Sequence, residues 1–182
     1  MTALLAVLGA VLCACTVSSE IAPQPDFNVQ QVTGKWFLIG FATNAQWFIN
    51  HRSSMKMGTA KITPTADGDL NISYAGLTPG GSCWRINSMA KKADVPGKFT
   101  YTSQRWGSEN EMTIVEVKYN KYAMIHMIST KGGVPTIINK LYGRGAELSS
   151  DVLEKFRIFS LKTGILPENI AVLPKNGECP AA

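Results

Sequence analysis

Few residues of this chain have the types and spacing that nucleophilic or metal chemistry needs. Its 182 residues include two histidines, His51 and His126, which lie far apart and have no carboxylates at ligand spacing beside them. The stretch "GGSCW" around Ser82 lacks the second glycine of a nucleophile elbow. Similarly, "YGRGAEL" lacks the third glycine of a dinucleotide fingerprint. The sequence therefore predicts no metal site and no cofactor, and Ser82 is expected in a turn.

Thiol chemistry depends on four cysteines, and two of them lie in an apolar leader. Residues 1–19, "MTALLAVLGAVLCACTVSS", hold an uncharged run that ends in small residues, which is typical of a secretory signal peptide. The run is shorter than the ~20 apolar residues of a membrane span, so we expect no stable membrane insertion. An N-terminal anchor is the alternative. In particular, "LCAC" is similar to the lipobox of bacterial lipoproteins, in which Cys15 would carry the lipid.

Removal of the leader would leave residues 20–182 as one secreted, extracellular domain that contains Cys83 and Cys179. An even pair of cysteines in an oxidising compartment predicts one disulfide. It would close a span of 96 positions (179 − 83) and join the tail to the body of the domain. Loop entropy gives such a bond a contribution of ~4–5 kcal/mol.

The distribution of charge does not favour a nucleic-acid partner. A net charge of +5 results from 18 basic and 13 acidic residues, and the lysines are scattered along the chain. Nucleic-acid-binding proteins concentrate basic residues in a patch or stripe, so we expect no nucleic-acid partner. The prediction is a monomer with a solvated basic surface.

Short alternating runs separated by turn residues make up most of the domain. They predict eight strands: residues 34–42, 56–63, 69–75, 82–92, 97–106, 111–119, 121–130 and 135–143. Asp67-Gly68, between the second and third, is a strong hairpin signal. Short connections favour an antiparallel meander over βαβ units. We expect an all-β fold, an eight-stranded antiparallel up-and-down barrel with an interior wide enough for one small ligand.

One α-helix is predicted after the strands, packed against the outside of the barrel. Apolar residues recur there at helical spacing: Val152, Phe156 and Phe159. Ser150 or Asp151 is expected at the N-cap, with Glu154 available for a capping box. Gly164 is expected to end the helix.

The third strand indicates which side chains face the interior. Asn71-Ile72-Ser73 is an N-glycosylation acceptor, so Asn71 must face solvent if it carries a glycan. Strand alternation then places Leu70, Ile72 and Tyr74 inside the barrel.

The start of the first strand resembles a known family. Gly34-Lys35-Trp36 matches the G-x-W signature of the lipocalins, and Arg144 in "LYGRG" matches the arginine that this family packs across the tryptophan. The resemblance covers nearly all of residues 25–180. It implies that Trp36 closes the narrow end of the barrel under the Arg144 guanidinium, a cation–π contact worth ~0.5–2 kcal/mol.

Within the lipocalins, the chain is most similar to the lipocalin-type prostaglandin D synthases, through "GKWFLIGFATNAQW", "DGDLNIS", "RWGS" and "VEVKYNKYA". Those enzymes use a catalytic cysteine on the second strand, because a soft thiolate must open an O–O bond. Counted back from the Asp-Gly turn, that position is Gly58 here, and the hydroxyl residues that assist it fall on Leu38, Ala60 and Tyr74. The resemblance therefore implies the barrel without the enzyme.

The leading hypothesis is a non-catalytic carrier of a small hydrophobic ligand such as a retinoid, fatty acid or bile pigment. Leu38 and Gly40 are expected above Trp36, with Trp47 as a lid at the mouth. The full set of predicted ligand contacts is Leu38, Trp47, Gly58, Ala60, Ile72, Tyr74, Trp106, Ile125, Met127 and Tyr142. The alternatives are an isomerase with a new nucleophile (Lys56, Tyr74 or Ser82) and an interaction protein whose barrel is filled.

Overall fold

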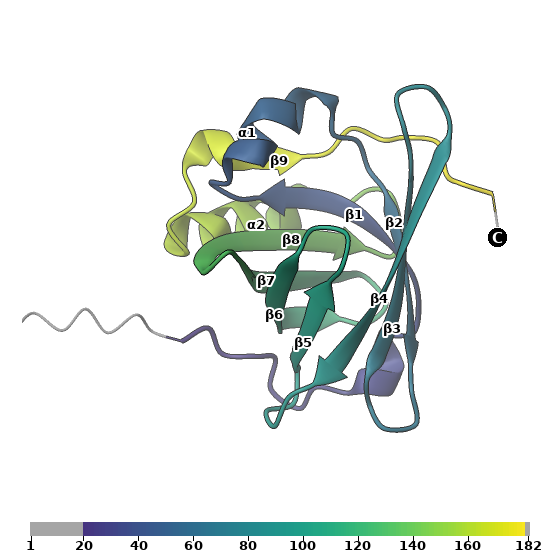
Figure 1. Ribbon diagram of the computed structural model, residues 1–182, viewed down its shortest axis with the longest axis vertical. Coiled ribbons are helices and arrows are strands. Elements are labelled where there is room, and N and C mark those ends of the chain that lie inside the picture. The colour runs from purple at the N-terminus through teal and green to yellow at the C-terminus, as the bar shows by residue number, and fades with distance from the viewer. Residues whose placement is uncertain (1–19, 181–182) are drawn as a thin grey trace, which may run out of the picture.

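The computed structural model describes residues 20–180 and shows one sheet curled into a barrel (Figure 1). The leader predicted for residues 1–19 lies outside the described residues. The strands are β1 (Gly34–Ala42), β2 (Thr59–Pro64), β3 (Leu70–Leu77), β4 (Cys83–Lys92), β5 (Lys98–Ser103), β6 (Ser108–Lys118), β7 (Tyr122–Lys131), β8 (Val134–Gly143) and β9 (Ile170–Val172). The helices are α1 (Gln46–His51) and α2 (Ser150–Lys162), with 3-10 turns η1 (Val29–Val32), η2 (Arg52–Ser54) and η3 (Pro167–Asn169).

Strand β1 closes the barrel by pairing with both β2 and β8. The sheet order is β2-β3-β4-β5-β6-β7-β8-β1-β9, with an additional pairing of β2 and β1. Phe37 pairs with Thr59 on one side and with Gly143 on the other, both in antiparallel register. The predicted eight-stranded up-and-down barrel is confirmed.

Two short elements were not predicted, α1 and β9. Strand β9 runs beside the second half of β1, from Gly40↔Val172 to Ala42↔Ile170, where β2 no longer reaches. Helix α1 follows β1 where the sequence suggested only a turn. With six and three residues, these elements are too short to show a periodic apolar pattern.

A bulge in β1 changes which residues face the interior. The register shifts between Leu38 and Gly40, and Phe41 then pairs with Lys140. Gly40 therefore points outward, where an added Cβ would lie 2.7 Å from Cε1 of Phe156 and 2.9 Å from Cβ of Leu141. The prediction that Gly40 lies above Trp36 is wrong, because one extra residue in a strand reverses the alternation beyond it.

Helix α2 covers this outer face of the barrel, as predicted (Figure 1). Phe156 is 1% exposed, and its ring occupies the space that a side chain at Gly40 would need. The N-cap is Ser149, which makes no side-chain capping bond, and Glu154 pairs with Arg157 instead of forming a capping box. Gly164 ends the helix with φ of +83°, as expected of a residue after the last turn.

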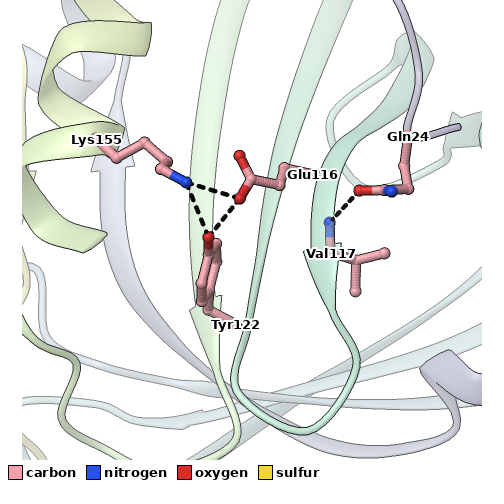
Figure 2. A network of polar contacts seen from close by, with 5 residues as sticks. All are labelled: Gln24, Glu116, Val117, Tyr122 and Lys155. Carbon is pink, nitrogen blue, oxygen red and sulfur yellow. Dashed lines mark hydrogen bonds and ion pairs between the residues drawn. The ribbon is translucent and has the colours of Figure 1, made fainter. Parts of the chain in front are cut away.

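Polar contacts tie α2 and the N-terminal segment to the barrel (Figure 2). The Lys155 ammonium on α2 donates to the Glu116 carboxylate at 2.9 Å and to the Tyr122 hydroxyl at 3.2 Å. The Tyr122 hydroxyl also donates to Glu116. Burial opposes ionisation, but these two donors lower the pKa of Glu116. Nearby, the side-chain oxygen of Gln24 accepts from the Val117 amide at 3.0 Å.

The predicted disulfide between Cys83 and Cys179 is confirmed, with a Cα–Cα distance of 5.6 Å and a separation of 96 residues. It fastens the C-terminal tail to the start of β4. Among residues 20–180, no helix has the length and apolar character that crossing a bilayer requires.

Candidate ligand-binding site

Trp36 closes one end of the barrel beneath the guanidinium of Arg144. The indole is 1% exposed, and its N–H donates to the carbonyl of Val32 at 2.9 Å. The guanidinium carbon lies 3.7 Å from the ring centroid, which is the stacking that the family resemblance implied. Gly34 has φ of +104°, and a Cβ there would lie 3.2 Å from Nη1 of Arg144. The guanidinium also donates to three backbone carbonyls, those of Gln31, Lys35 and Tyr119.

A narrow apolar cavity extends above Trp36 between the strands. It is lined by Val32, Trp36, Ala60, Ile62, Leu70, Ile72, Tyr74, Met112, Ile114, Ala123, Ile125, Met127, Lys140 and Tyr142. Six of the ten predicted contacts are in this lining: Ala60, Ile72, Tyr74, Ile125, Met127 and Tyr142. The sequence interpretation missed six lining residues, of which all but Val32 lie on predicted strands: Val32, Ile62, Met112, Ile114, Ala123 and Lys140.

The cavity is small in the closed barrel. About 550 Å³ of space lies between its side chains, including the part open to solvent, but only about 30 Å³ can hold the centre of a water molecule. One water needs ~10–15 Å³ on this measure. A ligand larger than a few atoms must therefore displace side chains, and Met112 and Met127 are flexible enough to move.

The mouth of the barrel is covered by α1, but not through the tryptophan that was predicted as a lid. Phe48 is fully buried and packs on Phe41, with ring centroids 5.2 Å apart. Trp47 is 49% exposed and only touches these two rings edge-on. Helical geometry turns adjacent residues to different sides, so Phe48 fills the mouth while Trp47 faces outward.

Two further predicted contacts lie away from the cavity lining. Trp106 is 57% exposed in the turn between β5 and β6, with the guanidinium carbon of Arg105 5.0 Å from its ring centroid. Leu38 packs against the buried core but does not line the cavity. The predicted strand of residues 97–106 ends at Ser103, which leaves Trp106 in the turn.

Gly58, the position that the resemblance aligns with a catalytic cysteine, is closed to a side chain. A Cβ on Gly58 would lie 2.8 Å from the carbonyl oxygen of Ala75 and 3.8 Å from the Trp84 indole. The same indole lies 2.7 Å from a Cβ added to Gly76. The Ala75 carbonyl therefore blocks a side chain at Gly58, and the Trp84 indole blocks one at Gly76.

Of the described residues that line the cavity, Lys140 alone is charged. Its ammonium lies 5.5 Å from the ring centroid of Tyr74 and 6.0 Å from that of Phe41. Burial lowers the pKa of Lys140 to about 8, because the charged form is poorly solvated there.

Three phenols lie in the same region and stay neutral at physiological pH. Burial is the main cause that raises the pKa of Tyr74 well above 10, and it raises the pKa of Tyr101 to about 12. The pKa of Tyr142 is raised as well, also by burial. The cavity thus offers neutral hydroxyls and one amine within an apolar wall.

The other predicted sites lie outside the cavity. Asn71 is exposed on β3, so the acceptor is accessible, and its glycosylation stays a prediction. His51 is exposed on α1, whereas His126 is buried on the outer face of β7. Across residues 20–180, no three His, Cys, Asp or Glu residues come together in a group able to hold a metal ion.

Comparison with known proteins identifies the family. The model of the Lipocalin / cytosolic fatty-acid binding protein family matches residues 33–177. The chain belongs to the lipocalin family. A solved structure described as "The Siderocalin Ex-FABP functions through dual ligand specificities" superposes on this lipocalin with a TM-score of 0.72 at 28% identity, covering 82% of this chain and 99% of the other.

Curated relatives of this lipocalin carry two kinds of name. One from Rhinella marina, named Lipocalin, is 37% identical over 168 residues, 92% of this chain and 91% of the relative. One from Ovis aries, named Prostaglandin-H2 D-isomerase, is 33% identical over 162 residues, 88% of this chain and 84% of the relative. Another isomerase by name, from Canis lupus familiaris, is 31% identical over 177 residues, 97% and 91% of the two chains. These relatives are named either as a lipocalin or as an isomerase, so their names alone do not assign an activity to this chain.

Proposed function

We propose that this lipocalin is a secreted carrier that binds one small hydrophobic molecule in its barrel cavity and does not catalyse its isomerisation. The observation that supports this most directly is the apolar cavity above Trp36, whose lining contains no cysteine among residues 20–180. Burial of a ligand's apolar surface at ~25 cal/mol per Å² supplies the driving force. Part of that free energy is used to move Met112, Met127 and Phe48 away from the positions they occupy in the closed barrel.

Isomerase activity of the kind named for the relatives is the second candidate, and the geometry disfavours it. A Cβ at Gly58 would clash with the Ala75 carbonyl oxygen, 2.8 Å away. The remaining candidate nucleophiles are poorly placed, since Lys56 and Ser82 are exposed. Tyr74 does line the cavity, but its raised pKa keeps the phenolate scarce.

Ligand binding can be tested by tryptophan fluorescence during titration with retinol, oleate or bilirubin. We expect saturable quenching by at least one of them. Ala60→Phe fills the cavity and should weaken binding by about tenfold or more, whereas Lys61→Phe adds the same ring to the outer face of β2 and should leave binding unchanged. A flat titration with all three ligands would overturn the carrier proposal in favour of an interaction protein with a filled barrel.

Catalysis needs a separate assay, in which prostaglandin H2 and glutathione are incubated with the purified protein. We expect product formation equal to the buffer blank. Turnover above the blank that disappears in Ala60→Phe and persists in Lys61→Phe would show that the cavity is an active site.

Secretion and processing are also proposals, supported by the leader and by the Cys83–Cys179 disulfide. Expression of the full chain in eukaryotic cells should release a protein that lacks the leader, holds no free thiol and carries a glycan absent from Asn71→Gln. A native mass spectrum of the medium measures all three properties. Retention of residues 1–19 or recovery in the membrane fraction would support an anchored form instead.

A further inference from the structure

Lys140 has an unusual position for a lysine. It lies on β8, where Tyr142 of the cavity wall is two positions along and the buried Ile138 is two positions before it. It faces Phe41 on β1 through the register of the two strands. The side chain therefore extends into the barrel instead of into solvent.

Within the described part of the chain, no carboxylate forms an ion pair with Lys140. Ion pairs of the described residues involve other lysines and arginines, and the groups beside its ammonium are the rings of Tyr74 and Phe41. Burial alone accounts for the lowered pKa of Lys140. A lysine without a carboxylate partner in an apolar pocket is the arrangement that favours a neutral, nucleophilic amine.

We propose that Lys140 condenses with an apolar aldehyde that enters the cavity, so that this lipocalin holds such aldehydes as a covalent imine. The inference rests on the proposed carrier function, because the aldehyde must first occupy the barrel. It names a ligand class, long-chain or polyene aldehydes, whose apolar part contacts the cavity wall while the carbonyl carbon reaches Nζ.

The step balances without any further reagent. The lone pair of the neutral Nζ attacks the carbonyl carbon, an N–C bond forms, and the C=O π electrons move to oxygen, which takes up a proton. That proton comes from nitrogen, and transfer of the second nitrogen proton to the hydroxyl lets it leave as water, which breaks the C–O bond and forms C=N. One amine and one aldehyde become one imine and one water, with no change of oxidation state.

The amine is available at physiological pH. With a pKa of about 8, roughly a quarter of Lys140 is neutral at pH 7.5, compared with roughly 0.1% of an ordinary lysine. That is about a 200-fold advantage in free amine over surface lysines. The apolar wall also limits the water that would hydrolyse the imine.

The test uses decanal as probe, sodium cyanoborohydride to reduce any imine, and peptide mapping to locate the label. We expect one decyl group per chain, with about tenfold or more label on Lys140 than on any other lysine at pH 7.5. Lys140→Met and Lys140→Arg should lose this label, and Lys61→Met, which changes an exposed lysine on β2, should keep it. The arginine variant retains a long cationic side chain, so it tests the amine even if the methionine variant folds poorly.

Decanol and decanoate separate failure of the inference from failure of the carrier proposal. If decanol binds to the wild-type protein but label from decanal spreads evenly over surface lysines, the imine proposal is wrong. Binding of decanoate far above decanol, with no excess label on Lys140, would also overturn it, because Lys140 would then act as a cation. If decanol does not bind and Lys140 remains unlabelled, the imine proposal falls, and the carrier proposal falls with it only if the retinol, oleate and bilirubin titrations are flat as well.

Discussion

Arg144 stabilises the closed end of the barrel through stacking and through its fixed fork of donors. Its guanidinium lies 3.7 Å from the Trp36 ring centroid and donates to three carbonyls, at 2.8 to 3.3 Å. Replacement by methionine leaves those carbonyls without their donors, so we expect Arg144→Met to lower the free energy of unfolding by about 2–4 kcal/mol. Urea denaturation followed by tryptophan fluorescence measures the loss.

The matched control is Arg157→Met, because Arg157 is half-exposed and pairs only with Glu154 one turn away. Its loss should leave the free energy of unfolding almost unchanged, because solvent screens an exposed ion pair. The loss of unfolding free energy in Arg144→Lys should lie between those of Arg144→Met and Arg157→Met, since lysine keeps the charge but not the planar guanidinium. Equal stability of all three variants would show that Arg144 is not a structural residue.

His126 should make stability depend on pH. Burial lowers the pKa of this ring below 6.5, while the hydrogen bond to the Asn139 side-chain oxygen at 2.8 Å acts in the opposite direction. The unfolded chain therefore binds the proton more readily than the folded one. The stability contributed by neutral His126 is present above pH 6.5 and is lost as pH falls through the lowered folded pKa, with a slope of at most ~1.4 kcal/mol per pH unit.

The measurement compares unfolding free energies of wild type and His126→Gln between pH 7.5 and 5. We expect the wild type to lose its advantage over the variant as the pH falls. His51→Gln is the control, since His51 is exposed on α1. A constant difference between wild type and His126→Gln across this range contradicts the prediction.

The sequence identified the residues of a rare motif but missed Lys140, because lysines are frequent and usually exposed. Gly34, Trp36 and Arg144 form a signature that few sequences share, so their roles followed from the resemblance. Lys140 was grouped with the scattered surface lysines, although Tyr142 had been placed inside and Lys140 is two residues before it. The alternation was sufficient to find it, but the usual exposure of lysine concealed it.

Helix α2 and strand β1 fit together because Gly40 leaves room for Phe156. A Cβ at Gly40 would approach the Phe156 ring to 2.7 Å and Leu141 to 2.9 Å, and both residues are buried. We expect Gly40→Ala to destabilise the protein by about 1–3 kcal/mol through overpacking. Thermal unfolding followed by circular dichroism measures this.

Phe156→Leu tests whether the helix contact is the cause. In the double variant with Gly40→Ala, the smaller side chain should relieve part of the clash, so the two effects should not add. Gly145→Ala is the control glycine, because its added Cβ meets only the Glu147 carbonyl, at 4.0 Å. Strict additivity of Gly40→Ala and Phe156→Leu would place the strain elsewhere.

Elements with several repeats of an apolar pattern could be predicted, and interruptions of a pattern could not. The eight strands and α2 each show alternation or a stripe over many residues. The β1 bulge adds one residue with no change in composition, so Gly40 was assigned to the wrong face. Helix α1 is six residues long, and only its packing against Phe41 shows that Phe48 rather than Trp47 covers the mouth.

The whole barrel depends on contacts between distant parts of the chain. Closure pairs β1 with β8, so that Phe37 lies opposite Gly143. Beyond the barrel, the tail returns to the sheet through the disulfide, and the exposed ion pair of Lys35 and Glu178 adds a second contact. Cysteine counting predicted the disulfide, whereas the path of the tail depends on β9, which has no sequence signal.

Removal of the disulfide should reveal how much the tail constraint contributes. Cys83 and Cys179 enclose 96 residues, and loss of such a loop costs about 4–5 kcal/mol of unfolding free energy in the chain-entropy description. For a domain of this size, Cys83→Ala/Cys179→Ala should lower Tm by about 10–20 °C. Lys35→Met, which removes only the ion pair of the tail, should lower it by about 2 °C or less.

The cavity lining contains neither cysteine, so retinol or decanol binding below the new Tm should match the wild type. A Tm change as small as that of Lys35→Met would contradict the prediction, because it would mean that the disulfide adds little constraint to the unfolded chain.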